Sequence, residues 1–213
     1  MRKTVFISLM TLMLGVSAQA QGVWEVPQQQ EKADSKAQKL EKKSEDERYL
    51  RGAVPVVDGR VTWKLDVPVE NKNATELYDR MLEIMTAMTR EEGQLEDSKV
   101  SLVNREQHTI VATMREWIVF KSNAIMLDRA KMSYVFTAEC TDGKVHVVLS
   151  RFKYDYDERP RHQFKYKAEE WITDEVALNK KGTRLYPVSA KFRRKTIDRK
   201  DEIFARIQTA LTR

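Results

Sequence analysis

Apolar and polar residues alternate one by one through much of residues 100–156, and this pattern predicts a run of β-strands. Residues 131–140 alternate without a break, with Met132, Tyr134, Phe136, Ala138 and Cys140 on one face. The same period of two occurs in residues 108–119 and 145–156. Alternation of β-branched and aromatic residues is typical of an antiparallel sheet with one buried face.

The last of these segments changes phase in its middle. Its apolar positions are Val145, Val147 and Leu149, followed by Phe152, Tyr154 and Tyr156. Asp142-Gly143 precedes it, and Asp-Gly between two alternating runs is a strong hairpin signal. One more alternating segment, residues 61–69, predicts a first strand upstream.

Residues 73–92 predict a long helix between the first strand and the others. Asn73 and Glu76 have the spacing of a capping box, and Gly93 suits the helix end. The apolar stripe of this helix consists of Leu77, Met81, Ile84, Met85 and Met88. Ordinary core packing against the sheet is the favoured interpretation of this stripe, and we expect it at Leu77.

The alternative for the same stripe is a ligand pocket between the helix and the sheet, because methionine side chains suit adaptable apolar surfaces. The candidate pocket residues are Met85, Met88 and Tyr134.

Two further helices are predicted after the strands, in residues 168–179 and 198–211, with Pro187 between them. The resulting order is β-α-β-β-β-β-α-α, which defines an α+β protein with an antiparallel sheet, one long helix across it and two C-terminal helices. About 160 residues suffice for one buried core, so we expect a single domain over residues 53–213.

The N-terminus has the pattern of a secretory signal peptide. Arg2 and Lys3 precede an apolar run, residues 5–16, and Ala18-Gln19-Ala20 provides a cleavage site. The apolar run falls short of the ~20 residues that span a bilayer, and no cysteine lies near the site for lipid attachment. We therefore expect cleavage after Ala20 and a mature protein in the periplasm or outside the cell, soluble and without a transmembrane segment.

Residues 21–52 predict a flexible, charged stalk. Leu40 and Leu50 are almost the only large aliphatic residues between residues 27 and 51. Such a segment buries too little apolar area to offset the entropy of ordering.

The charge of the chain indicates no particular partner. Lys and Arg number 38 against 32 acidic residues, a formal net charge of +6, and the two signs are well mixed. The densest basic cluster consists of Lys191, Arg193, Arg194, Lys195, Arg199 and Lys200. We interpret it as flanking a strand and leading into the last helix, and we expect no nucleic-acid partner. Attraction to anionic envelope lipid or polysaccharide is the other interpretation.

No residue pattern points to a catalytic, cofactor or metal site. The single cysteine, Cys140, continues an apolar strand face and is interpreted as a small buried hydrophobe. The histidines, His108, His146 and His162, lack the spacing of zinc ligands. Asp155, Asp157 and Glu158 do not fit a calcium loop, because Pro160 stands where that loop needs glycine, so a solvated acidic turn is expected. We expect no cofactor.

Several longer stretches resemble a known family. They are Gly52-Ala-Val-Pro55 with Asp58-Gly-Arg-Val-Thr-Trp63, the capped helix from Asn73, Glu170-Trp-Ile-Thr-Asp-Glu175, Asn179-Lys-Lys-Gly-Thr-Arg-Leu185 and Lys191-Phe-Arg-Arg-Lys-Thr-Ile-Asp198. The chain is similar to exported bacterial proteins whose shared domain is known only as a domain of unknown function with a TBP-like fold. The resemblance implies a curved antiparallel sheet with a helix laid across it and an envelope location. It assigns no catalytic or binding residue.

The sequence therefore favours a non-enzymatic binding or structural module of the envelope. Its partner would be an apolar ligand or an envelope protein. The alternatives are an enzyme whose site is assembled from dispersed residues and, less favoured, a polyanion-binding protein. Buried acids or histidines with shifted pKa values in an open cleft would favour the enzyme.

Overall fold

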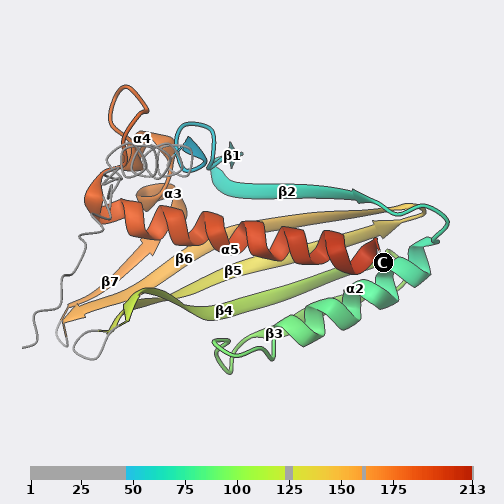
Figure 1. The fold of residues 1–213 in the computed structure, drawn as a ribbon. Coiled ribbons are helices and arrows are strands. Elements are labelled where there is room, and N and C mark those ends of the chain that lie inside the picture. Colours follow the sequence, from blue (N-terminus) through green and yellow to red (C-terminus); the bar gives the residue numbers. More distant parts are fainter. Residues whose placement is uncertain (1–46, 123–126, 160–161, 213) are drawn as a thin grey trace, which may run out of the picture. The chain divides into compact units, whose positions relative to one another are not determined.

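The computed structural model describes residues 47–122, 127–159 and 162–212, in which two long helices cover one face of a sheet (Figure 1). The predicted signal peptide and most of the predicted stalk lie outside these residues. No helix in the part of the chain that the structure describes is long and apolar enough to cross a membrane.

The strands of the described residues form one antiparallel sheet. Their order is β1 (Val56–Val57), β2 (Arg60–Pro68), β6 (Lys144–Arg159), β5 (Leu127–Thr141), β4 (Thr109–Ser122) and β3 (Lys99–Asn104), and β7 (His162–Lys167) also pairs with β6. The predicted antiparallel sheet and α+β class are confirmed. Strand β7 was not predicted, because it is a short edge strand with only Phe164 and Tyr166 as apolar residues. The expected acidic turn after Asp155 is instead the end of β6.

The two faces of the sheet differ as the alternation predicts. The face toward the helices carries fully buried side chains, among them Ile110, Met114, Met132, Phe136 and Tyr154. The other face carries small, hydroxyl-bearing and charged side chains that are partly exposed. We call this second face the open face.

Helix α2 (Ala74–Met88) begins as predicted and ends four residues early. Asn73 and Glu76 form the capping box, and the Asp142 carboxylate of the β5–β6 hairpin accepts a further bond from the Ala74 N–H at 2.8 Å. The Thr89 hydroxyl donates to the carbonyl of Thr86 at 2.8 Å, a local bond that competes with helix continuation. The helix start is therefore fastened both by its own cap and by the hairpin.

Helix α5 (Pro187–Leu211) is longer than predicted and includes the residue expected to separate two helices. Pro187 stands in the first turn, where its fixed φ suits a helix and its missing N–H costs nothing. The predicted helix over residues 168–179 is two short ones, α3 (Ala168–Trp171) and α4 (Asp174–Ala177). Thr173 interrupts it in an extended conformation as the N-cap of α4.

Arg193 of α5 is completely buried and binds the backbone of two distant segments. Its Nε donates to the carbonyl of Tyr49, and its Nη2 donates to that of Leu50, both at 2.6 Å. Its Nη1 donates to the carbonyl of Ile172 at 2.6 Å, and Nη2 also contacts the Asp174 carboxylate at 2.7 Å. We call this set of bonds the Arg193 clamp.

The packed domain consequently starts earlier than the predicted boundary at residues 52 and 53. Tyr49 is 3% exposed, and its hydroxyl donates to Asp198 at 2.6 Å. The Gly52 N–H donates to Asp174 at 2.7 Å. Residues 47–52 therefore belong to the domain rather than to a stalk. The bonds from Arg193 are accepted by the backbone carbonyls of Tyr49 and Leu50, which carry no sequence signal.

Cys140 lies in the core, in agreement with its interpretation as a buried hydrophobe. Burial raises the pKa of its thiol from 9.0 to about 12. The reactive thiolate is therefore scarce at neutral pH.

Alanine substitution distinguishes a packed core from a pocket under α2. Leu77 is 2% exposed and Met85 is 0% exposed, so Leu77→Ala and Met85→Ala should each lower the free energy of unfolding by about 2–5 kcal/mol. Chemical denaturation with unchanged m-values measures this loss, and exposed Glu83→Ala serves as the control. A loss below about 1.5 kcal/mol at Met85 alone would reveal space beside that side chain.

Removal of the Arg193 guanidinium should weaken the fold and release residues 47–52. Arg193→Met leaves Asp174 and three carbonyls without their partner, and we expect a loss of about 3–5 kcal/mol. Trypsin should then cut after Arg48 and Arg51 in the variant but not in the unchanged protein. Lys195→Met, exposed on the same helix, is the matched control. Unchanged stability together with an unchanged digestion pattern would contradict the clamp.

Candidate functional site

A β-bulge in the middle of β6 sets up the site. The pairs Ser133↔Lys153 and Val135↔Ser150 place two residues of β6, Arg151 and Phe152, opposite one residue of β5. Arg151 has φ 59°, a conformation that few residues with a side chain adopt. The extra residue explains the phase change in the sequence and returns Phe152 to the buried face.

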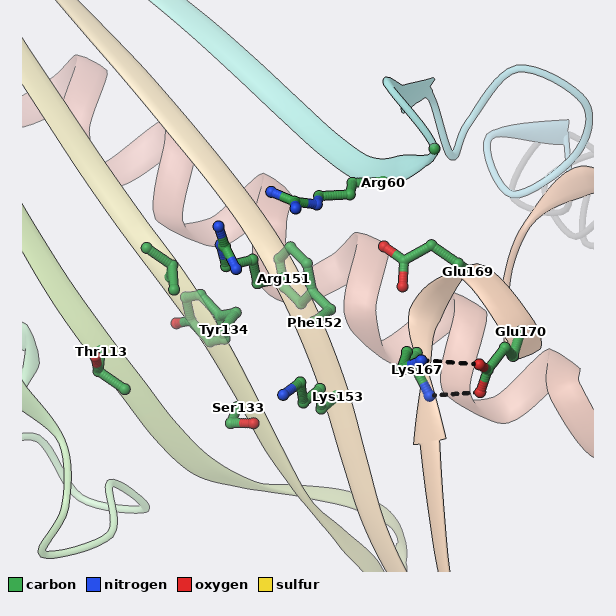
Figure 2. A pocket seen from close by; sticks show the side chains of 12 residues that line it. Arg60, Thr113, Ser133, Tyr134, Arg151, Phe152, Lys153, Lys167, Glu169 and Glu170 are labelled. Atoms are coloured by element: carbon green, nitrogen blue, oxygen red, sulfur yellow. Dashed lines mark hydrogen bonds and ion pairs between the residues drawn. The ribbon is translucent and has the colours of Figure 1, made fainter.

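Strand β6 also changes its outer neighbour at the bulge. Its pairing with β2 reaches Thr62↔Ser150, and its pairing with β7 begins at Lys153↔Lys167. Arg151 lies between the two pairings. A hollow of about 510 Å³ occupies this position and is shown in Figure 2. We call it the junction hollow.

The junction hollow has walls from elements that are far apart in the sequence. Gly59 at the β1–β2 turn and Glu169 of α3 both line it. Thr113, Ser133 and Val135 of the open face contribute hydroxyl and aliphatic groups. The hollow is therefore a recess formed by several elements of the fold, and its lining is partly polar and partly apolar.

Four cationic side chains line the junction hollow: Arg60, Arg151, Lys153 and Lys167 (Figure 2). Lys167 forms an ion pair with Glu170, with Nζ and Oε1 3.3 Å apart. Within residues 47–122, 127–159 and 162–212, the structure gives no ion pair or side-chain hydrogen bond to Arg60, Arg151 or Lys153. These three charges are free to meet a ligand.

The two carboxylates of the junction hollow have partners within the chain. Glu169 accepts the Val61 N–H at 2.7 Å and so fixes the start of β2. Glu170 is engaged by Lys167. The charge that remains available is positive, and such a recess attracts anions and binds carboxylate, sulfate or phosphate through charge-assisted hydrogen bonds.

The candidate pocket residues from the sequence lie elsewhere, apart from Tyr134. Met85 and Met88 of α2 are fully buried and do not line the junction hollow. Tyr134 is 1% exposed, stacks on Phe152 with ring centroids 5.0 Å apart, and contributes to the junction hollow. The two methionines thus occupy the core, which is the favoured interpretation of that helix face.

Sequence reasoning missed Arg60, Arg151, Lys153 and Lys167. The only signal near them was the phase change between Leu149 and Phe152. A bulge re-aims neighbouring side chains and is frequent beside functional sites, so that phase change could have drawn attention to Arg151 and Lys153. Nothing local connects them with Arg60 or Lys167.

The basic cluster of α5 is not a continuous charged surface. Arg193 is buried in the clamp, and Arg199 reaches Glu116 of β4. Lys191 donates to Asp128 at 2.9 Å and to the Tyr156 hydroxyl at 2.7 Å. These cations are engaged in the fold, and the cluster lies within a helix rather than beside a strand as predicted.

Glu116 and Arg199 form the buried charged pair that would be the candidate for an enzyme site. Arg199 donates to the Glu116 carboxylate through Nε at 3.1 Å and contacts it through Nη2 at 3.0 Å. The side-chain amide of Gln94 donates to the same carboxylate at 2.7 Å. Although burial opposes its charge, the nearby Glu116 raises the pKa of Arg199. Burial, and next the charge on Glu116, raises the pKa of Tyr134. The pair is matched and hydrogen-bonded, which is the pattern of a structural ion pair.

The described histidines have single polar partners. His108 lies 3.0 Å from the Thr75 hydroxyl, and His146 lies 3.0 Å from the Asp66 carboxylate. The side chain of His162 is not among those that the structure describes. Among the residues whose positions are given, no group of three or more His, Cys, Asp or Glu is placed to hold a metal ion.

Comparison with known proteins identifies first the fold and then the family. A TBP-like protein from Parabacteroides distasonis is 20% identical, with a TM-score of 0.62 over 74% of this chain and 96% of that one. It supports the fold: this is an α+β protein with a TBP-like curved antiparallel sheet, as the sequence predicted.

The sequence model of a domain of unknown function with TBP-like fold, DUF4468, matches residues 63–155. A DUF4468 protein from Bacteroides ovatus is 39% identical, with a TM-score of 0.73 over 78% of this chain and 94% of that one. The chain belongs to the DUF4468 family, which confirms the predicted resemblance. No curated protein matches it.

Proposed function

We propose that this protein is an exported, non-enzymatic binding module of the bacterial envelope that holds an anionic ligand in the junction hollow. The observation that carries the proposal is the convergence of Arg60, Arg151 and Lys153 on one recess, without ion-pair partners among the described residues.

The backbone of Arg151 supports a binding role for this side chain. A non-glycine residue at φ 59° costs about 1–2 kcal/mol, and such conformations cluster at ligand sites. Glycine would serve the bulge without this cost. A ligand of its guanidinium would explain an arginine at this position, because the backbone does not need one.

The way in which the other charged groups are used supports binding rather than catalysis. Glu116 and Arg199 neutralise each other, Glu169 holds a backbone N–H, and Glu170 holds Lys167. A general base needs a carboxylate or imidazole that is open to substrate. The junction hollow offers cations and hydroxyls, which favour binding over proton transfer.

Export rests on the N-terminal sequence. Arg2 and Lys3, the apolar run over residues 5–16 and Ala18-Gln19-Ala20 together form a signal peptide pattern.

The mature protein should begin at Gln21 and be found outside the cytoplasm. N-terminal sequencing of protein from a cell fraction that excludes the cytoplasm checks both points. Ala20→Arg, which removes the small residue before the cleavage site, should block processing. Recovery of chains that still begin with Met1 from the unchanged protein would contradict export by this route.

Anion binding is tested with dextran sulfate against uncharged dextran of equal length. At physiological salt, we expect only dextran sulfate to bind. The double variant Arg151→Gly, Lys153→Gln should lower its affinity at least tenfold, since one charge-assisted contact of about 1.5 kcal/mol is worth that factor. Glycine is chosen because it accepts the backbone angle of the bulge.

A second double variant controls for general charge effects. Lys180→Gln, Lys195→Gln removes the same charge at exposed positions outside the junction hollow and should change the affinity less than twofold. Equal losses in both double variants, or no binding of dextran sulfate at all, would refute an anion site at the bulge.

A further inference from the structure

We infer that the ligand is a linear acidic polysaccharide, bound as a segment of at least two sugar units that carry their negative charges on separate units. This inference rests on the proposed anion-binding function and specifies the chemistry of the ligand. It is carried by the size of the junction hollow, the separation of its cations and the kind of groups beside them.

The junction hollow is too large for one small anion. Its volume of about 510 Å³ lies within the range of about 300–1,000 Å³ that holds ligands of drug size. A lone sulfate or phosphate would leave most of it filled with water. A short oligosaccharide segment has the matching size.

The cations surround the junction hollow instead of meeting at one point. Arg60 and Arg151 reach toward the same region, whereas Lys153 lies apart from them, close to Ser133 (Figure 2). Arg151 and Lys153 are two residues apart on β6, a separation of roughly 7 Å along an extended strand. Two anionic groups along a chain can therefore engage these cations at separate positions, one near Arg60 and Arg151 and the other near Lys153.

Hydroxyl groups lie beside the separated cations, on the β4 and β5 side of the junction hollow (Figure 2). Thr113 and Ser133 line the junction hollow, and Val135 adds an aliphatic patch beside them. A hydroxyl both donates and accepts hydrogen bonds, which matches the hydroxyls of a sugar ring. The apolar C–H faces of the same ring would contact the aliphatic patch.

The lining argues against nucleic acid as the polyanion. Single-stranded nucleic acids are bound through aromatic side chains that offer a ring face to each base. The aromatic residues of the junction hollow, Tyr134 and Phe152, stack on each other and are no more than 2% exposed. They offer no platform for a base.

A bilayer surface fits the site poorly as well. Peripheral proteins that bind lipid combine basic residues with apolar side chains that insert beside the headgroups. In the junction hollow, Phe152 and Tyr134 are buried, and Val135 is only partly exposed. A flexible chain can enter such a recess, whereas a flat membrane cannot.

A longer ligand would meet further cations on the open face. The register places Ser133, Lys153 and Lys167 in one row across β5, β6 and β7, and the row continues on β4 with Arg115, which pairs with Asp97. Lys131 lies two residues from Ser133 on the same face of β5. Affinity is therefore expected to rise with the length of the saccharide.

The test measures binding of galacturonate and alginate oligomers of one, two, four and six units by calorimetry at physiological salt. In at least one series, we expect the affinity to rise tenfold or more from one unit to four. The methyl-esterified tetramer, which lacks the charge, should lose at least tenfold. Arg151→Gly and Lys153→Gln should each weaken the tetramer about tenfold, and Lys195→Gln should leave it unchanged.

The outcomes separate this inference from the proposed function. If dextran sulfate binds through Arg151 and Lys153 but neither saccharide series gains affinity with length, the anion site stands and the saccharide inference is wrong. The inference is also wrong if phosphatidylglycerol vesicles or a single-stranded thymidine oligomer bind more tightly than every tetramer through the same two residues. If no anion binds in the junction hollow, the proposed function fails first.

Discussion

The bulge at Arg151 is the constraint on which the arrangement of this sheet depends. Strand β6 must bury Val145, Val147 and Leu149 beneath the helices, and farther along it must bury Phe152 and Tyr154 on the same face. The interval between Leu149 and Phe152 is odd, so a regular strand would turn one of the two sets toward solvent. The extra residue resolves the conflict, and it does so where β6 exchanges β2 for β7 as its neighbour. The recess at this exchange is a consequence of how the core is buried.

The strands and the first helix could be predicted from the sequence because their signals are local. Period-two alternation marked β4, β5 and β6, and the capping box at Asn73 marked the start of α2. Even the bulge left a trace in the change of phase. The junction hollow could not be predicted, because its cations come from the start of β2, the middle of β6 and the end of β7. Which strands flank the bulge is decided by pairing between segments about 90 residues apart in the chain, and a single sequence carries no signal for that choice.

The charges of α5 show a second limit of sequence reasoning. Arg193 and Arg194 are neighbours with the same side chain, yet the structure buries Arg193 completely. What distinguishes it is a set of carbonyls from Tyr49, Leu50 and Ile172, which any residues could provide. Glu116 is different, because it is a charged residue at a position of β4 where the alternation calls for an apolar one. The sequence alone therefore shows that this side chain needs a partner. Its partner, Arg199, lies 83 residues later, and only the fold shows that the conflict is resolved.

The division between partnered and unpartnered charges is what separates structure from function in this protein. A buried arginine such as Arg193 or Arg199 must be matched by acceptors, because an unmatched charge in the interior is strongly destabilising. An exposed cation carries no such penalty and adds little to stability, so the fold does not require Arg60, Arg151 or Lys153 to be charged. Arg151 in addition holds a backbone angle that glycine would hold more easily. Local features that the fold does not need are expected at sites selected for binding. Three such cations line the junction hollow, and an anionic ligand that spans the hollow would engage them.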